Sequence, residues 1–181
     1  GVIRLDDELI EILDVERVLV EVLGIDPDLD AVMQTDAGNY LHAGQKVLMV
    51  DDSSMARKQI SRTLNEINVP HIVACDGKEA LDLLNELAAQ TDTNITNSIP
   101  MVISDIEMPE MDGYTLVKQI RKTPALADLY VLVHTSLNGS INTEQAKKSG
   151  ADEILEKFVP EELAAAITRG LKKCNNIQDA S

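Results

Sequence analysis

The chain has 181 residues, a length that suits one ordinary domain with an extension better than two complete domains. Hydrophobic residues make up 44% of the composition and aromatic residues only 2%, so a core must be built from aliphatic side chains and methionine. The formal net charge of −15 opposes binding to nucleic acid, because no local basic patch offsets it. We therefore expect no nucleic-acid partner.

The cysteines and the apolar runs indicate neither secretion nor membrane insertion. Cys75 and Cys174 lie in separate segments without the spacing of a metal site, which favours free reduced thiols. The apolar runs are too short to span a bilayer, and the N-terminus has no basic region followed by an apolar stretch. We predict a cytoplasmic protein with no direct membrane insertion. Because the pattern is already under way at Gly1, we also expect a fragment of a longer protein.

The first 45 residues carry only a partial pattern of secondary structure. Residues 8–13 are predicted to form a strand and residues 15–23 a short helix, but neither belongs to a complete repeat. Residues 24–45, which include Asp26-Pro27-Asp28, are predicted to be a linker. The main domain is therefore expected to begin at Lys46.

From Lys46 onward, five short apolar runs alternate with longer amphipathic runs. The short runs are rich in Val, Ile or Leu, and we predict that they form strands: Val47–Val50, His71–Cys75, Met101–Ser104, Tyr130–His134 and Glu153–Glu156. None of them alternates cleanly between polar and apolar residues, which indicates burial on both faces of the sheet. The pattern predicts an α/β fold with a doubly wound, five-stranded parallel sheet.

The five helices that connect and follow these strands have recognisable ends. Serine or aspartate caps, a glycine stop and a first-turn proline set their limits, and each of these residues suits the terminus it occupies. The expected positions are, in chain order, after Ser53 or Ser54, 78–89 with Asp76 as the cap, from Asp112-Gly113, 143–149 before Gly150, and from Pro160. Residues 90–98 are polar and are predicted to be a long exposed loop.

Polar residues follow four of the five predicted strands at the point where each strand ends. They are Asp51-Asp52 after the first strand, Asp105 after the third, Thr135-Ser136 after the fourth and Lys157 after the fifth. In parallel α/β sheets, the crevice at the carboxyl ends of the strands is the usual ligand site. We therefore expect Asp105 to end a buried strand because a site requires a carboxylate there.

This group of residues predicts phosphoryl-transfer chemistry. Carboxylates brought together without a counter-charge repel one another and raise one another's pKa values, which a divalent cation relieves. Oxygen ligands favour Mg²⁺, which takes one or two carboxylates and keeps several waters. A lysine and a hydroxyl can hold the remaining oxygens of a phosphoryl group while Asp105 acts as the nucleophile and forms an acyl phosphate.

In chain order, these residues resemble the receiver domain of two-component response regulators. Asp51-Asp52, Asp105, Thr135 and Lys157 match the acid pair, phospho-acceptor, hydroxyl and lysine of that family. The resemblance implies a flavodoxin-like fold with strand order 2-1-3-4-5, a receiver domain over residues 46–174 and a tail over 175–181. It also implies a histidine kinase as the phosphodonor.

Glu107 lies two residues after the acceptor and completes the predicted Mg²⁺-binding set of Asp51, Asp52, Asp105 and Glu107. The carboxylate of Glu107 is also expected to tune the lifetime of the acyl phosphate, by repelling or misorienting the water that hydrolyses it. The roles predicted for the reaction itself belong to Asp105, Lys157 and Thr135. Ser136 is assigned no role.

The N-terminal sequence "LIEILDVERVL" looks like the closing strand and helix of a CheW-like coupling domain, which would make residues 1–23 the end of that domain. A coupling domain followed by a receiver is the plan of CheV-type chemotaxis proteins. This resemblance implies chemoreceptors as partners through the coupling domain and a chemotaxis kinase as the phosphodonor.

Two positions depart from the receiver pattern. Phe158 follows Lys157 where the family usually has proline, and Ile154 stands where many receivers carry the aromatic residue of their conformational switch. Isoleucine is stiff about its first torsion and cannot repeat a large aromatic swing. We therefore expect the signal to travel through Thr135 and the segment that follows it. His134 is predicted to be a strand residue whose polar atoms are satisfied.

Two other classes of function are compatible with part of this pattern. A phosphohydrolase of the haloacid dehalogenase type also uses an aspartate nucleophile and Mg²⁺, but it places a second aspartate where this chain has Glu107. A pure interaction scaffold with a vestigial site is the other class. The presence of Asp51, Asp105 and Lys157 argues against it.

Overall fold

The computed structural model describes residues 2–5, 8–11, 36–90, 94–136, 148–157 and 159–178. Its main sheet contains five parallel strands, β3 (Val47–Val50), β4 (His71–Ala74), β5 (Met101–Ser104), β6 (Tyr130–Thr135) and β7 (Glu153–Glu156). They are arranged in the order β4-β3-β5-β6-β7. Counted from β3, this is the order 2-1-3-4-5, so the predicted fold is confirmed.

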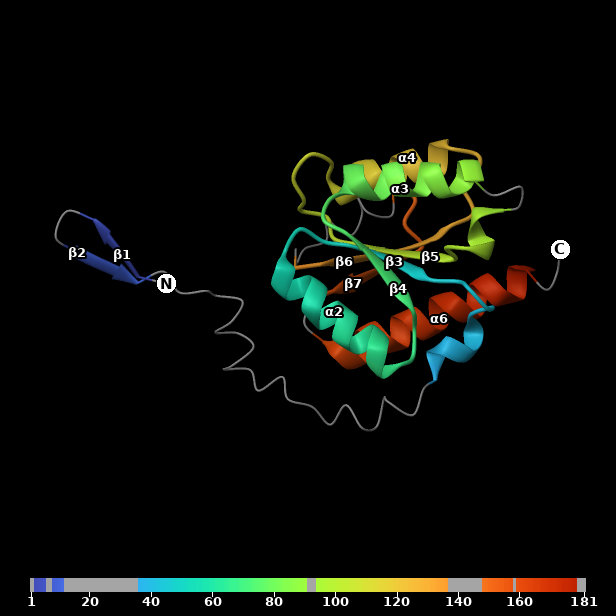
Figure 1. Cartoon of the computed structure of the whole chain (residues 1–181), viewed down its shortest axis with the longest axis horizontal. Helices are drawn as coiled ribbons and strands as arrows, with labels where there is room; N and C mark the ends of the chain where they lie inside the picture. Colours follow the sequence, from blue (N-terminus) through green and yellow to red (C-terminus); the bar gives the residue numbers. More distant parts are fainter. Residues whose placement is uncertain are drawn as a thin grey trace.

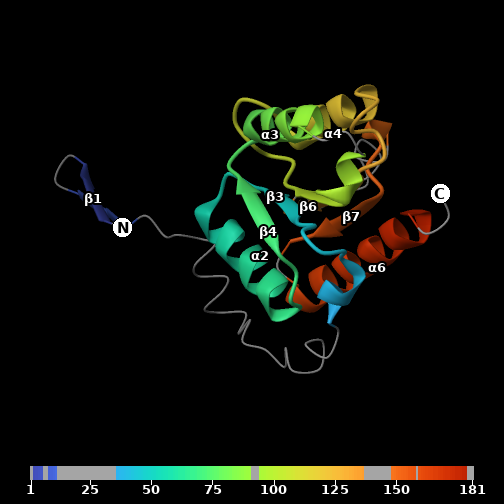
Figure 2. The same ribbon diagram turned by 45° about the vertical axis from the view of Figure 1, so that its right-hand side comes forward.

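Helices cover both faces of the sheet (Figures 1 and 2). Helices α3 (Gly77–Gln90) and α4 (Gly113–Lys122) pack on one face, and α2 (Ser54–Glu66) and α6 (Pro160–Gln178) pack on the other. Two hydrophobic clusters fill the space between these layers, one on each face. Every residue of β3, β5 and β6 is buried, which explains why these strands show no polar alternation.

Side chains cap the helices where the sequence predicts. The Ser53 hydroxyl accepts a hydrogen bond from the Ala56 amide at 3.3 Å, which makes Ser53 rather than Ser54 the first cap. Asp112 caps α4 in the same way, and its carboxylate accepts from the Thr115 amide at 2.9 Å. These caps begin both helices directly after the polar carboxyl edge of the sheet.

The packed unit begins earlier than Lys46. A 3-10 helix, η2 (Ala37–Tyr40), buries Ala37 completely in the cluster beneath α2 and α6. The Gly38 amide donates to the Ile67 carbonyl at 3.2 Å, and a Cβ at Gly38 would lie 2.3 Å from the Asn68 carbonyl oxygen. The described part of the predicted linker, residues 36–45, therefore belongs to the packed domain. One buried alanine is too small a signal to be recognised in a polar stretch.

Two further segments differ from the predictions, and a third is only partly described. Residues 94–98 do not form a wholly exposed loop, because the 3-10 helix η3 (Ile95–Asn97) buries Ile95 to 1% exposure. Helix α6 continues to Gln178, past the predicted limit at residue 174. Of the helix predicted over 143–149, residues 143–147 lie outside the described residues, and 148–149 are helical.

The N-terminal described residues form a separate antiparallel pair, β1 (Val2–Leu5) and β2 (Glu8–Glu11). Strand β2 overlaps the strand predicted over residues 8–13, whereas β1 was not predicted. The helix predicted over 15–23 lies outside the described residues. Among the described helices, none is both long enough and apolar enough to cross a membrane.

Candidate functional site

The predicted carboxylates meet at the carboxyl edge of the sheet. Asp51 follows β3 and Asp105 follows β5, and one carboxylate oxygen from each of Asp51, Asp52 and Asp105 lies within 4.8 Å of the others. Asp51 is completely buried, Asp105 is 5% exposed and Asp52 is exposed. The cluster is therefore buried on one side and open to solvent at Asp52.

Lys157 reaches this cluster from the residue after β7. Its ammonium nitrogen lies 2.8 Å from Oδ2 of Asp51 and 2.9 Å from Oδ2 of Asp105. The lysine side chain is only 7% exposed, so these ion pairs are shielded from water. One lysine thus bridges two of the three aspartates, and the cluster as a whole keeps an excess of negative charge.

Main-chain amides hold the other oxygen of each bridged carboxylate. The Ser53 amide donates to Oδ1 of Asp51 at 2.9 Å, and the Ile106 amide donates to Oδ1 of Asp105 at 2.7 Å. Each of the two carboxylates therefore directs Oδ1 to the backbone and Oδ2 to Lys157. This arrangement fixes the orientation of both groups.

The pKa values reflect the conflict between burial and charge. Burial raises the pKa of Asp51 above its ordinary value, and repulsion from Asp105 adds to the rise, although Lys157 opposes it. Burial would lower the pKa of Lys157, but its hydrogen bonds and attraction to Asp51 and Asp105 outweigh that effect and raise it. Lys157 therefore stays protonated and serves as the buried counter-charge of the site.

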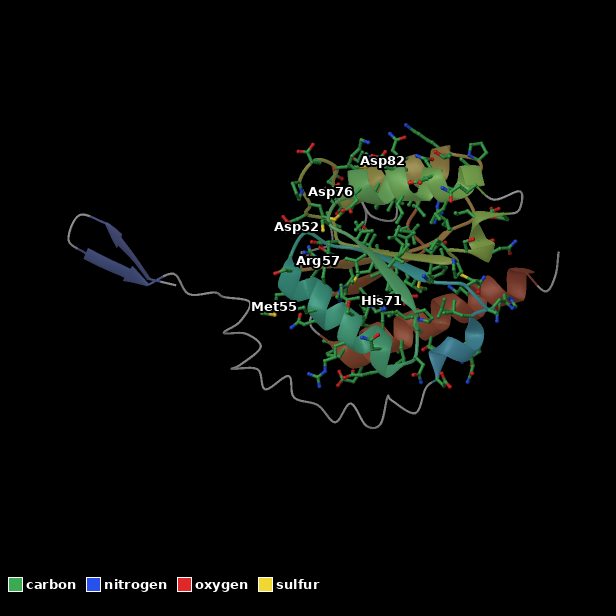
Figure 3. All side chains as sticks on the ribbon, in the orientation of Figure 1. Asp52, Met55, Arg57, His71, Asp76 and Asp82 are labelled. Atoms are coloured by element: carbon green, nitrogen blue, oxygen red, sulfur yellow. The ribbon has the colours of Figure 1, made fainter. Side chains whose placement is uncertain are left out.

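An unpredicted residue, Arg57, also contacts the acid pair. It lies in the first turn of α2, and its Nη1 donates to the main-chain carbonyls of Asp51 and Asp52 at 2.8 Å each. Figure 3 shows Asp52 and Arg57 near the N-terminal end of α2. Nothing in the sequence distinguishes this arginine, because basic residues are common on exposed helix faces.

The loop after Asp105 depends on a glycine. The Gly113 amide donates to the Ile106 carbonyl at 2.9 Å, and a Cβ at Gly113 would lie 2.0 Å from the main-chain oxygen of Asp105. The sequence explained this glycine only as part of a helix start. The structure adds that the backbone of α4 must approach Asp105 closely.

The remaining predicted residues occupy different surroundings. Thr135 is the last residue of β6 and is 2% exposed, and its main-chain carbonyl accepts from the Lys157 amide at 2.9 Å. Glu107 is exposed and lies outside the cluster formed by the three aspartates. Ser136 is also exposed, whereas Ile154 is half-buried and packs against the cluster on the α3 and α4 face. Phe158 lies outside the described residues.

The prediction that His134 is satisfied is wrong. Its side chain is 5% exposed, and neither ring nitrogen has a hydrogen-bond partner among the described residues. Tyr130 and Leu132 pack in the cluster beneath α6, and strand alternation sends His134 toward the same apolar face. Burial, with a smaller contribution from the positive charge of Lys157, lowers the pKa of His134 to about 3. The ring is therefore neutral at pH 7.

The donor set fits Mg²⁺. Asp51, Asp52 and Asp105 offer only carboxylate oxygens, and Mg²⁺ prefers oxygen ligands and is commonly bound through one or two carboxylates. The cluster contains no histidine or cysteine, the ligands that softer metals prefer. A cation would also offset the negative charge that Lys157 leaves uncompensated.

Comparisons with known proteins agree with this geometry. The model of a family described as the response regulator receiver domain matches residues 47–168, more than half of the chain. The chain is 30% identical over 169 residues to the chemotaxis protein CheV1 of Helicobacter pylori, which covers 92% of this chain and 50% of that protein. It is 31% identical to CheV3 of the same organism over 174 residues, with 96% and 55% covered. The chain thus spans about half the length of these curated relatives.

Solved structures are also similar to this chain. Vibrio cholerae chemotaxis protein CheY4 is 32% identical with a TM-score of 0.59, and the match covers 70% of this chain and 98% of that one. The receiver domain of the Francisella response regulator 1452 is also 32% identical, with a TM-score of 0.60 and coverage of 71% and 98%. The residues matched by the family model include all three clustered aspartates, Thr135 and Lys157.

Proposed function

Because the chain belongs to the response regulator receiver domain family, we propose that it is a phospho-accepting signalling protein in which Asp105 receives the phosphoryl group. The observation that carries this proposal is the position of Lys157, whose ammonium lies 2.9 Å from Oδ2 of Asp105 within a cluster of three aspartates. The donor is a phosphohistidine on a chemotaxis histidine kinase. The similar proteins that are named as chemotaxis proteins support this choice.

The side chains suit an in-line transfer. A carboxylate oxygen of Asp105 forms a bond to phosphorus as the bond between phosphorus and the donor imidazole nitrogen breaks, and the electron pair remains on that nitrogen. Lys157 and the Thr135 hydroxyl hold phosphoryl oxygens, so charge is stabilised where it develops. The Ile106 amide keeps the Asp105 carboxylate in a fixed orientation during the attack.

Asp51, Asp52 and Asp105 would hold Mg²⁺, which when bound neutralises part of the charge on the phosphoryl oxygens. Glu107 is the remaining member of the metal set predicted from the sequence. Its exposed side chain suits a role in the hydration of the site, where its charge acts on the water that hydrolyses the acyl phosphate. Replacement of Glu107 by alanine should therefore change the rate of dephosphorylation rather than abolish phosphorylation.

The part of the chain before the receiver is proposed to belong to a coupling domain. Residues 1–23 would form its C-terminal end, and chemoreceptors would be its partners, as the match to the CheV proteins supports. Strands β1 and β2 have four residues each, and a two-stranded pair of that length requires further strands for stability. Phosphorylation of Asp105 would then change how the coupling domain engages receptors and kinase. The predicted cytoplasmic location remains a prediction.

The proposal is tested with a small phosphodonor such as acetyl phosphate in the presence of MgCl₂, followed by mass spectrometry. We expect one added phosphate, located on Asp105, and none after chelation of Mg²⁺ or in the Asp105→Asn variant. Asp128→Asn is the matched control, since Asp128 is an exposed aspartate outside the cluster, and it should be phosphorylated like the wild type.

Phosphate that persists in Asp105→Asn contradicts the assignment. Rapid multiple turnover of the donor would favour a phosphohydrolase, and the absence of modification would favour a scaffold.

A further inference from the structure

Among the described arginines, Arg57 is the one that is hydrogen-bonded to Asp51 and Asp52, and its bonds go to their main-chain carbonyls, not to their carboxylates. Both of its contacts, at 2.8 Å, go to the main-chain carbonyls of Asp51 and Asp52. The Arg57 amide also donates to the Ser53 carbonyl at 3.0 Å, so the first turn of α2 holds the residue in place. A guanidinium beside carboxylates would ordinarily pair with them in a bidentate contact. Here the carboxylate oxygens are left for other ligands.

The contact matters most for Asp52. Asp51 has its Oδ1 fixed by the Ser53 amide and its Oδ2 by Lys157. Among the described residues, the carboxylate of Asp52 has no comparable holder, and its side chain is exposed. Its direction toward the cluster is therefore set by the backbone, and the backbone carbonyl of Asp52 is one of the two groups that Arg57 binds.

We infer that Arg57 is a positioning residue for the cation site, acting through the backbone of residues 51 and 52. This inference rests on the proposed function, because it assumes that the three aspartates bind Mg²⁺. By binding two successive carbonyls from one nitrogen, Arg57 fixes the peptide planes from which both carboxylates project. It thereby prearranges them for a cation without competing for their oxygens, as outer-shell partners of metal ligands do elsewhere.

Electrostatics alone makes the opposite prediction. A positive guanidinium near the cluster repels Mg²⁺, so its removal should tighten cation binding if charge were its only influence. If Arg57 positions the acid pair, its removal should weaken binding instead. The sign of the change therefore separates the two roles, and a purely structural role in α2 would change stability but not cation affinity.

The experiment is an Mg²⁺ titration at constant ionic strength, followed by the amide NMR signals of Ser53 and Ile106. These amides donate to the carboxylates of Asp51 and Asp105, so they report on the site directly. In Arg57→Met, which keeps an unbranched apolar stem, we expect the dissociation constant to rise about tenfold. Arg57→Lys should recover part of that loss, because an ammonium can donate to a carbonyl.

Lys58→Met is the matched control. Lys58 is the next residue of α2 and is exposed, and among the described residues no hydrogen bond or ion pair joins it to Asp51 or Asp52. Its replacement therefore removes the same charge and leaves the contacts of Arg57 with the two carbonyls in place. We expect its Mg²⁺ affinity to be unchanged or slightly higher. The phosphorylation rate of Lys58→Met at saturating Mg²⁺ should stay within about threefold of the wild type, because Lys58 is not part of the site and Lys157 is left in place.

Unchanged or tighter Mg²⁺ binding by Arg57→Met overturns the inference, as does an equal loss in Lys58→Met. If Arg57→Met does not give the dispersed spectrum of a folded protein, Arg57→Gln is titrated in its place, with the same expected loss and the same contradictory outcomes. Failure of the proposed function is recognised separately. In that case the wild type itself shows no saturable Mg²⁺ binding, or Asp51→Asn binds Mg²⁺ as well as the wild type.

Discussion

The two edges of the sheet use arginine and aspartate in opposite ways. At the amino edge, Arg121 donates to the carbonyls of Gly150, Ala127 and Leu129 at 2.9, 2.9 and 2.7 Å, and it pairs with Asp152 at 2.6 Å. Asp152 also accepts from the Val131 amide at 2.7 Å. Arg121 and Asp152 therefore satisfy each other's charge and the neighbouring main-chain groups, and the result is a closed structural network.

At the carboxyl edge the charges do not balance. Three aspartates face one lysine, and Arg57 binds carbonyls rather than supplying a second counter-charge to the carboxylates. Such an excess of negative charge, with two of its three carboxylates buried, opposes folding. The comparison indicates that the amino edge stabilises the sheet, whereas the carboxyl edge keeps the excess negative charge that the proposed cation site requires.

The largest effect expected from this comparison is that of Lys157→Met. Removing a lysine that is 7% exposed leaves two buried carboxylates without their counter-charge, which should lower the free energy of unfolding by about 3 kcal/mol at pH 7. Mg²⁺ should restore part of that stability, because a cation that binds only the folded state stabilises it. Urea denaturation with and without MgCl₂ measures both effects. A loss that Mg²⁺ does not reduce would show that the carboxylates are not held for a cation.

His134 provides the next largest effect and depends on pH. Its pKa is about 3 in the folded protein against 6.5 for the free side chain, so the unfolded chain binds the proton first as the pH falls. Above pH 6.5, His134 should therefore not lower the free energy of unfolding of the wild type. Between pH 6.5 and pH 3, the free energy of unfolding should fall progressively through this residue. At pH 4.5 the loss through this residue amounts to about 2–3 kcal/mol.

His134→Leu should remove that dependence while it fills the same apolar space. Urea denaturation of both proteins at pH 7 and pH 4.5 gives the comparison. His71→Leu is the control, since His71 is half-buried and its ring nitrogens contact Val69 and Ser61. Parallel curves for wild type and His134→Leu would mean that the imidazole has a partner at low pH.

The predictable parts of this molecule were those that follow from periodicity and chain order. Strands buried on both faces give continuous apolar runs, and the polar residue that ends each run must lie at one edge of a parallel sheet. Chain order and periodicity alone therefore predict that Asp51, Asp105 and Lys157 lie together at this edge. Asp52 is expected at the same edge because it directly follows Asp51 in the sequence.

The parts that the sequence did not reveal depend on contacts across the fold. The acceptors of Arg57 are backbone carbonyls, which every residue possesses, so no sequence pattern identifies them. The face on which His134 lies follows from alternation, but its lack of a hydrogen-bond partner among the described residues depends on the apolar cluster beneath helix α6, far along the chain. Burial of Ala37 depends likewise on α2 and α6. Tertiary surroundings rather than local preference decide these positions.

Arg121→Met tests the amino edge. The substitution removes three hydrogen bonds to carbonyls and an ion pair from a side chain that is 24% exposed, so we expect a loss of about 2 kcal/mol in the free energy of unfolding. In contrast to Lys157→Met, MgCl₂ should restore none of the difference between variant and wild type. Equal rescue of the two variants would remove the distinction between the two edges.

The smallest effect concerns Glu110, in the loop that joins Asp105 to α4. Glu110 has a φ of 59°, a left-handed conformation that costs most residues about 1 kcal/mol and that asparagine adopts more readily. Glu110→Asn should therefore raise the free energy of unfolding by about 0.5–1 kcal/mol.

The same substitution also removes one negative charge from the surroundings of an already acidic edge, and this second effect must be separated from the first. Glu107→Asn makes the separation, because Glu107 is an exposed acid of the same loop with no positive φ. If relief of backbone strain is the cause, only Glu110→Asn gains stability, and the gain persists in high salt, which screens exposed charges. If both variants gain equally and salt abolishes the gain, the excess charge of the carboxyl edge extends into this loop, and the strain at Glu110 contributes little.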